Sequence, residues 1–393
     1  MNVNAYSYLE NYGDSLYYYI FELANFSFVA FIIIFAYHIR LINSLSLTIW
    51  LLLALLPLFL NYFLLSPYTF PDQFEYFHET TSLLTTGNST DRLIETKRLG
   101  GGISEITFAS KIFGAVPLPN FMTVTSIAFI NKLMSFALFV WLARFIKEEK
   151  LIFFFLVPSF VLYSSLSLRD SLVIILAIVS LINFVNLKNI FGLLFLIPLY
   201  FLKIQLFLFL AVYFVGRTLF KAHKSMAGMV TFFGLGLVAA FAVQEFLLLW
   251  LNYYRIGFIA ENMAGGYAMW GRFGDASLYH LDTLFEVFFV SLTKLPEFLL
   301  MPLPWDWGNP LYIVQCFESI ALIYGLYYIL QNYKMARNQE FIFLFSVLLI
   351  GLSFYAFLSE NVGTFVRYRF SLFLPFLITM YYVATRDSVK SKT

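Results

Sequence analysis

Charged residues are scarce in this chain: they make up 12% of its 393 residues, whereas 61% are apolar. A soluble domain carries about 25% charged residues, so this composition cannot cover a water-facing surface. Soluble enzymes, nucleic-acid-binding proteins and disordered scaffolds are excluded on this ground. The net charge of +2 is too small to define an acidic or a basic partner. The composition therefore predicts an all-α, polytopic membrane protein.

Cysteine and histidine are almost absent. Cys316 is the single cysteine, so neither an intrachain disulfide nor a cysteine cluster for a metal can form. The chain also lacks a G-x-x-x-x-G-K-[ST] phosphate loop, and no basic residue precedes its first apolar run, so we expect no cleavable signal peptide. We expect no metal and no cofactor. Aromatic residues, by contrast, make up 21% of the chain, which suits a protein with many anchors at the membrane interface.

Apolar runs long enough to cross a bilayer recur along the sequence. A spanning helix needs about 20 mostly apolar residues. We expect spans near 16–38, 45–65, 121–143, 152–167, 171–187, 227–250, 311–331, 341–358 and 365–384. The run 189–220 is too long for one helix and is interrupted by Lys203, which predicts two short helices meeting at the membrane edge. The run 284–302 contains three charged residues and is predicted as a re-entrant or interfacial helix.

Basic residues recur at every second boundary between these runs, and short cytoplasmic loops are enriched in Lys and Arg. They are Arg40, Arg144, Lys147, Lys150, Lys188, Arg217, Lys221, Lys224, Lys334, Arg337, Arg386, Lys390 and Lys392. The pattern predicts a single integral membrane domain over 1–393, with about eleven spans, the N-terminus outside and the C-terminus in the cytoplasm. The outer side then receives a first loop at 66–120 with amphipathic segments. It also receives a second region at 251–302, made of a loop and the re-entrant helix.

Four cations lie near the predicted outer boundary, where positive charge is disfavoured: Arg169, Lys203, Arg367 and Arg369. Two interpretations compete. In the structural one, Arg169 pairs with Asp170 or Glu360 and the other cations reach lipid headgroups. In the functional one, the four converge on an anion, because arginine binds phosphate oxygens in a bidentate manner and lysine adds a point charge. A pyrophosphate at the membrane surface is the anion that fits.

Carboxylates cluster at the start of the first outer loop. In a helix, Asp72, Glu75 and Glu79 would share one face. Next to cations, Asp72 or Glu75 would act as a general base for a sugar hydroxyl. The alternatives are a solvated face of an interfacial helix and a Ca²⁺ or Mg²⁺ site at Asp72 and Glu75.

Further polar and aromatic residues are candidates for binding a glycan or the rest of the substrate. They are His78, Asp170, Gln205, Arg255, Arg272, Trp305, Asp306 and Tyr368. Arg255 and Arg272 belong to a loop that would equally serve as an ordinary polar cover, and Trp305–Asp306 would equally be an interfacial anchor. Lys132 falls in the middle of a predicted span and has no assigned role.

Three short motifs resemble the Wzy-type family of bacterial oligosaccharide repeat-unit polymerases. Pro158-Ser159-Phe160 followed by Leu168-Arg169-Asp170 is similar to their PS…LRD hairpin. Pro302-Leu303-Pro304-Trp305 resembles their PFPW segment, and Arg367-Tyr368-Arg369 resembles the RYR start of a late helix. The matches cover roughly 150–380, and the first 120 residues agree only in layout. This chain has Lys203 where the family pattern has an Arg, and lysine cannot bind an anion in a bidentate manner.

The resemblance implies an integral membrane glycosyltransferase similar to the GT-C type. Such an enzyme moves a growing glycan from undecaprenyl pyrophosphate to a hydroxyl of a new lipid-linked repeat, at the periplasmic face of a bacterial inner membrane. The product would be O-antigen, capsule or exopolysaccharide. The four cations would stabilise the departing pyrophosphate and Asp72 or Glu75 would activate the acceptor. The implied partners are the lipid-linked oligosaccharides, membrane lipids, a flippase and a chain-length regulator.

Two other functions remain open. A related transferase would add one sugar from a polyprenyl-phosphate donor, and ligation of a finished glycan to a lipid core is a variant of the same chemistry. A transporter or flippase for lipid-linked oligosaccharides belongs to a different class. Transporters place charged sites at the bilayer midplane between repeated halves. A transporter is favoured to a limited extent by Lys132 and the interrupted 190–220 run. The absence of a sequence repeat and the bias of cations to one face argue against it.

Overall fold

The computed structural model describes residues 16–60, 72–87, 105–119, 121, 123–264, 280–303, 310–332, 338–358 and 362–390. Regular structure in these residues is helical, as the composition predicts. The first eight helices are α2 (Leu16–His38), α3 (Ser44–Phe59), α4 (Asp72–Thr86), α5 (Glu105–Gly114), α6 (Ser126–Leu142), α7 (Glu148–Phe155), α8 (Pro158–Ser164) and α9 (Asp170–Val185). The others are α10 (Asn189–Leu202), α11 (Ile204–Thr218), α12 (Met226–Ala242), α13 (Gln244–Ala264), α14 (Leu284–Leu300), α15 (Pro310–Asn332), α16 (Gln339–Leu358) and α17 (Val362–Lys390).

The chain divides into two compact units. Unit 1 comprises residues 1–176 and 197–204, and unit 2 comprises residues 177–196 and 205–393. Helices α9 and α10 each begin in one unit and end in the other. Each unit has its own packed interior, described separately below.

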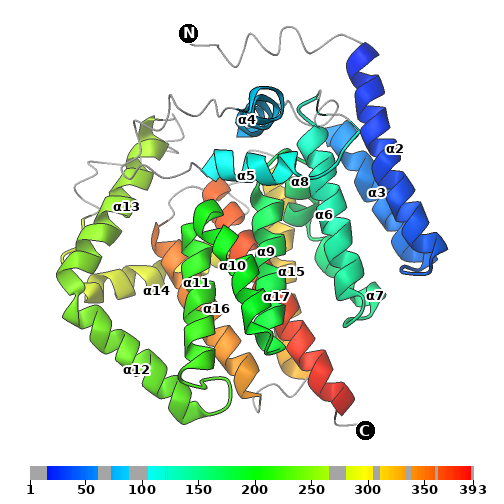
Figure 1. Cartoon of the computed structure of the whole chain (residues 1–393). Helices are drawn as coiled ribbons and strands as arrows, with labels where there is room; N and C mark the ends of the chain where they lie inside the picture. The colour runs from blue at the N-terminus through cyan, green and yellow to red at the C-terminus, as the bar shows by residue number, and fades with distance from the viewer. Residues whose placement is uncertain are drawn as a thin grey trace. The chain divides into compact units, whose positions relative to one another are not determined.

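Unit 1 is built around a hairpin of α2 and α3, which lie side by side and pack against α6 (Figure 1). Its aromatic centre is Trp50 of α3, whose indole ring lies 5.4 Å from the rings of Phe136 and Phe139 and 5.5 Å from that of Phe155. Edge-on and tilted aromatic contacts of this kind stabilise packing beyond simple area burial. A second pair, α4 and α5, comes from the predicted first outer loop and packs closely together.

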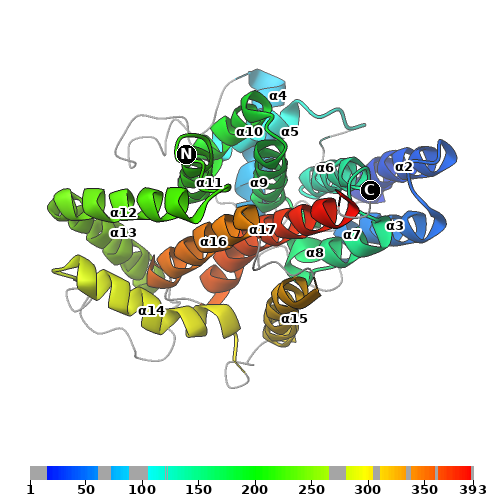
Figure 2. The same cartoon turned by 90° about the horizontal axis from the view of Figure 1, so that it is seen from below.

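Unit 2 is centred on α16 and α17, which run alongside each other, with α14 against α16 and α15 against α17 (Figure 2). A cluster of Leu251, Leu281, Phe357 and Leu358 joins α13, α16 and the start of α14. Asn252 fixes the chain before α14, because its side chain exchanges two hydrogen bonds with the backbone of Leu281, at 2.8 and 3.0 Å.

Three described helices are long and apolar enough to cross a membrane: Tyr19–His38, Tyr312–Gln331 and Gln339–Leu358. The pair α12 and α13 makes a fourth if it is counted as one broken span. Five shorter apolar helices, α3, α6, α9, α10 and α11, accompany them. Many large apolar side chains are exposed, among them Phe31 and Phe35 of α2 and Leu237 and Phe241 of α12. Exposed apolar surface on this scale is typical of a protein in contact with lipid.

The predicted break in the 189–220 run is confirmed: α10 ends at Leu202, α11 begins at Ile204, and Lys203 lies between them. Two predicted continuous helices are wrong. The 152–167 run is divided into α7 and α8, because Pro158 lacks an N–H and disfavours helical geometry in Val157 before it. The 227–250 run bends by 83° at Val243, where α13 starts afresh with Gln244 and Glu245. Helix α13 also extends to Ala264, into the segment predicted as the second outer loop.

Two neighbouring leucines of α3 test the packing of unit 1. Leu53 is buried among the helices, whereas Leu52 is 59% exposed. We expect Leu53→Ala to lower the free energy of unfolding by about 2 kcal/mol, because truncation leaves a cavity. Leu52→Ala, which removes the same atoms from the exposed side, should change stability by less than about 0.5 kcal/mol. Thermal unfolding of the detergent-solubilised chain measures both, and equal losses would contradict the packing of α3.

Candidate functional site

The 165–169 loop, which connects α8 to α9 and ends in Arg169, is held by buried side chains. The Asn131 amide of α6 donates to the carbonyl oxygens of Leu166 and Leu168, at 2.9 and 2.8 Å. Gln73 of α4 accepts a hydrogen bond of 3.0 Å from the backbone N–H of Ser167. The Ser167 hydroxyl donates to the Val124 carbonyl and accepts from the N–H of Ala128. The Leu166 and Leu168 carbonyls and the Ser167 hydroxyl are all bonded to other elements, so the loop has a defined conformation.

Lys132, which has no role in the sequence analysis, supports the same loop from the end of α8. Its ammonium group is buried, and Nζ donates to the Ser164 hydroxyl at 2.8 Å. The next residue, Ser165, donates to the Val161 carbonyl at 2.6 Å. The two serines thus satisfy groups at the helix end. The contact that the structure describes for Lys132 is therefore structural, because it stabilises the C-terminal end of α8.

Arg169 lies at the start of α9, where its carbonyl accepts the first intrahelical hydrogen bond from the N–H of Val173. Its guanidinium forms an ion pair with Glu105, the first residue of α5. The structural interpretation of the sequence named Asp170 or Glu360 as the partner. Asp170 is buried in the first turn of α9, where a carboxylate interacts favourably with the helix dipole. Glu360 is outside the described residues, so its pairing with Arg169 stays a prediction.

Lys203 occupies the break between α10 and α11 and is buried. Phe201, two residues earlier, stacks on Phe108 of α5 with the ring centroids 4.9 Å apart. Helix α5 therefore contacts Arg169 through Glu105 and the chain beside Lys203 through Phe108. Arg169 and Lys203 are two of the four cations predicted to bind an anion, and both thus lie on segments that pack against α5.

The segment that begins at Asp72 is helical, as the shared face of its carboxylates required, but these acidic residues do not share one environment. Glu79 is buried and accepts a hydrogen bond of 2.9 Å from the Thr107 hydroxyl of α5. Asp72 is half-buried, and Glu75 and His78 are exposed. Glu79 is thus a link between α4 and α5, and of the three carboxylates Glu75 is the most exposed.

A second polar network lies at the start of α6 and was not anticipated. The Glu22 carboxylate of α2 is buried and accepts a hydrogen bond from the Thr125 hydroxyl. Asn25 of α2 donates to Ser126 at 3.4 Å, and Thr123 bridges Thr125 and Ser126 at 3.0 and 3.1 Å. A carboxylate beside a helix N-terminus is favoured electrostatically. This network joins α2 to the chain that also carries Val124, which anchors the 165–169 loop.

In unit 2, Arg369 is buried and binds the end of α14. Its Nη1 donates to the carbonyl oxygens of Phe298, Leu299 and Met301, at 3.0, 2.9 and 2.7 Å. These carbonyls are at a helix C-terminus, where an arginine is the favoured partner. Arg369 therefore has a structural role at the start of the Pro302–Leu303 segment, and its contact with pyrophosphate stays a prediction.

Other predicted substrate residues are distributed over unit 2. Arg367 and Tyr368 are half-buried, and the Tyr368 ring lies 4.9 Å from that of Tyr355. Arg255 is buried, with its guanidinium 5.0 Å above the centre of the Phe357 ring, a cation–π contact. Gln205 is half-buried at the start of α11. Arg272, Trp305 and Asp306 are outside the described residues, so their assignments stay predictions.

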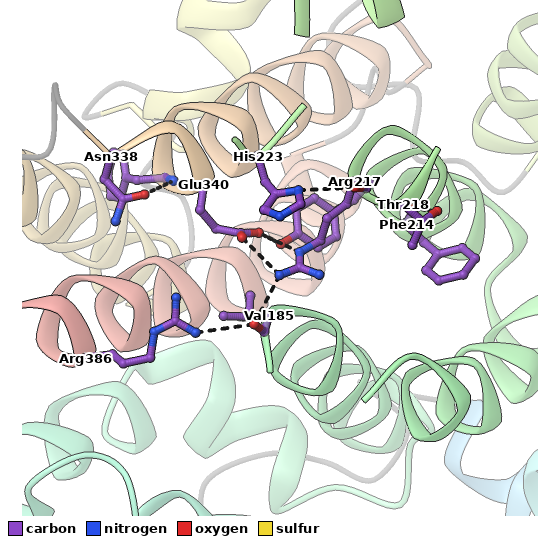
Figure 3. Close-up of polar contacts among 10 residues, drawn as sticks. Val185, Phe214, Arg217, Thr218, His223, Asn338, Glu340 and Arg386 are labelled. Carbon is purple, nitrogen blue, oxygen red and sulfur yellow. Dashed lines mark hydrogen bonds and ion pairs between the residues drawn. The ribbon is translucent and has the colours of Figure 1, made fainter. Parts of the chain in front are cut away.

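A buried ion pair ties together four helices of unit 2 (Figure 3). Arg217 of α11 donates to Glu340 of α16 through Nε at 2.9 Å and Nη2 at 3.1 Å, and the Tyr213 hydroxyl donates to the same carboxylate. Arg217 and Arg386 of α17 both donate to the Val185 carbonyl at the end of α9, at 3.1 and 3.3 Å. We refer to Tyr213, Arg217, Glu340, Arg386 and the Val185 carbonyl as the Arg217 cluster.

His223, in the loop after α11, borders the Arg217 cluster, with Nδ1 3.1 Å from the Arg217 carbonyl (Figure 3). Burial lowers the pKa of its imidazole, the positive charges of Arg217 and Lys224 lower it further, and the Glu340 carboxylate opposes them. Because its pKa is lower in the folded chain, the unfolded chain takes up the proton first. The contribution of His223 therefore favours folding less as the pH falls below its ordinary pKa.

Several residues of the site were missed because nothing in their local sequence marks them. Glu105 opens a short amphipathic helix, and Gln73 and Asn131 are uncharged. Glu22 carried a usable signal, because an ionisable residue within an apolar run is expensive unless partnered. In the described part of the chain, no group of three or more His, Cys, Asp or Glu side chains is arranged to hold a metal ion.

Asn131 tests how the 165–169 loop is held. We expect Asn131→Leu to lower the free energy of unfolding by about 2–3 kcal/mol, because it leaves the buried Leu166 and Leu168 carbonyls without their donor. Ser135, one turn along α6, is also buried, but its hydroxyl has no hydrogen-bond partner among the described residues. Ser135→Ala should therefore leave stability nearly unchanged. Thermal unfolding of both variants decides, and a neutral Asn131→Leu would contradict this role.

The Arg217 cluster is tested by a double-mutant cycle. Arg217→Met should cost about 3–5 kcal/mol of stability, because the Glu340 carboxylate is left buried without its partner. Arg217→Met combined with Glu340→Leu should be less destabilising than Arg217→Met alone, since no orphaned charge remains. Chemical unfolding in detergent measures the cycle. Additive losses would show that the two residues do not interact.

Comparisons with family models, with curated proteins and with solved structures found no match to this chain.

Proposed function

We propose that this chain polymerises oligosaccharide repeat units carried on undecaprenyl pyrophosphate. The reaction is glycosyl transfer from the lipid-linked chain to a hydroxyl of a lipid-linked acceptor. The proposal includes about eleven spans, with the site on the outer, periplasmic side of a bacterial inner membrane. It begins from the short motifs that resemble Wzy-type polymerases, above all Leu168-Arg169-Asp170.

The observation that carries the proposal is the packing of the first loop against Arg169. Helix α4 bears Asp72 and Glu75, and its Gln73 bonds the loop that ends in Arg169. Helix α5 reaches both Arg169 and the chain next to Lys203. Cations suited to a pyrophosphate and carboxylates suited to an acceptor hydroxyl thus belong to one packed unit. Cations bound to the leaving group stabilise its growing negative charge, and a nearby carboxylate accepts the proton of the attacking hydroxyl.

The proposed topology has independent support in each unit. In unit 1, segments predicted at the outer face pack together: α4, α5, the 165–169 loop and the chain before Lys203. In unit 2, four segments near predicted cytoplasmic boundaries meet in the Arg217 cluster: the ends of α9, α11 and α17 and the start of α16. Within each unit, the boundaries that meet therefore share one predicted side of the membrane.

The surface glycan of the source cell after deletion of the gene tests this function. We expect the ladder of chain lengths to collapse to a single repeat unit and to return with the intact gene. Arg169→Ala should lower polymerisation by about 10²–10³-fold, because a donor to the departing charge is lost. Arg144→Ala, which removes an exposed arginine on the predicted cytoplasmic side, should restore the full ladder. The membrane level of each variant is measured in parallel.

Other results would overturn the assignment in identifiable ways. An intact ladder lacking one sugar would indicate the transferase that uses a polyprenyl-phosphate sugar. Lipid-linked repeats retained at the cytoplasmic face would indicate the transporter or flippase. A full ladder with Arg169→Ala at a normal membrane level would remove Arg169 from the site.

A further inference from the structure

The guanidinium of Arg169 is already occupied by a carboxylate of the chain itself. Its ion pair with Glu105 joins the start of α9 to the start of α5. The Glu105 side chain is 39% exposed and that of Arg169 is 18% exposed, so the pair lies at a surface. Glu105 is the more exposed partner, whereas the paired Arg169 Nη1 atom is itself buried beneath it.

The two partners are held differently. Arg169 follows a loop whose backbone is bonded to Asn131 and Gln73, so the backbone position of Arg169 is fixed. Helix α5 is anchored by residues after Glu105: Thr107 bonds Glu79, and Ser110 bonds the Tyr76 carbonyl at 3.3 Å. Rotation of the Glu105 side chain away from Arg169 breaks none of these α5 contacts. Glu105 can therefore turn away from Arg169 without loss of the α5 contacts, while the backbone that leads into Arg169 stays bonded to α4 and α6.

We propose that Glu105 is an internal competitor for this anion site: its carboxylate occupies Arg169 until a diphosphate displaces it. The inference rests on the proposed function, in which that diphosphate is the headgroup of the lipid carrier. The exchange breaks one ion pair and forms another, with no covalent step. An anion must offer Arg169 more than a single carboxylate does in order to displace Glu105.

Charge and bidentate geometry decide how readily an anion displaces Glu105. A diphosphate carries more negative charge and more acceptor oxygens than one carboxylate, and it can bind the guanidinium fork in a bidentate manner. An anion with fewer charges, such as inorganic phosphate, gains less over Glu105. Because each anion must displace the same carboxylate, removing the Glu105 charge should tighten the binding of both anions by a similar factor. An orienting role for Glu105 predicts the opposite, since loss of the ion pair would then weaken binding.

Binding of inorganic pyrophosphate and of inorganic phosphate to the purified full-length chain, measured by calorimetry, separates these outcomes. We expect Glu105→Gln to tighten pyrophosphate binding about fivefold, the equivalent of about 1 kcal/mol for a partly exposed ion pair. It should tighten phosphate binding by a similar factor. Glu149→Gln, the same change at an exposed glutamate of α7, should have no effect. Glu105→Asp, which shortens the side chain, should fall between the wild type and Glu105→Gln.

Arg169→Ala in the Glu105→Gln background should abolish the gain. Weaker or unchanged pyrophosphate binding in Glu105→Gln would overturn the inference, as would a gain that survives Arg169→Ala. The measurement does not require polymerase activity. If the glycan ladder proves independent of the gene while the exchange at Arg169 is observed, the proposed function fails and the anion exchange stands. If the ladder depends on Arg169 but Glu105→Gln gains no affinity, only the exchange fails.

Discussion

A backbone loop can lie among apolar helices only if its N–H and C=O groups find partners, and the 165–169 loop meets this requirement through Asn131 and Gln73. The placement of α4, α5 and α6 around the loop is tied to that constraint. Asn131 requires α6 beside the loop, and Gln73 requires α4 on it. Helix α4 in turn binds α5 through Glu79 and Thr107. Arg169 is positioned by these neutral hydrogen bonds before any charge interaction is considered.

Buried charge is used in two ways in this chain. In the Arg217 cluster, a bidentate ion pair and a tyrosine hydroxyl satisfy one carboxylate, and the remaining donors reach a backbone carbonyl. Arg369 bonds three carbonyls at the end of α14. Both arrangements hold helix ends together. The Arg169–Glu105 pair differs because it is partly exposed, and exposure is what makes exchange with another anion physically accessible.

The helices that are long and strongly apolar were predictable from the sequence, because a run such as 16–38 or 339–358 has no alternative to a helix in an apolar environment. The break at Lys203 was predictable for the related reason that a charge interrupts such a run. The division at Pro158 was also predictable, because proline disfavours the interior of a helix, whereas hydropathy alone predicted one span over 152–167. The bend at Val243 has no proline or glycine at its position, and only the polar pair Gln244 and Glu245 marks it.

Composition and periodicity were sufficient to predict an apolar, largely helical chain with Arg and Lys residues beside its apolar runs. Composition and periodicity are local properties, so these conclusions needed no knowledge of contacts. The tertiary structure decided which groups meet: Glu105 with Arg169, Gln73 with Ser167, and Glu22 with Thr125. Each pair joins residues far apart in the chain. Which carboxylate meets which cation depends on how the helices pack, and packing is set by the summed contacts of many side chains rather than by any local pattern.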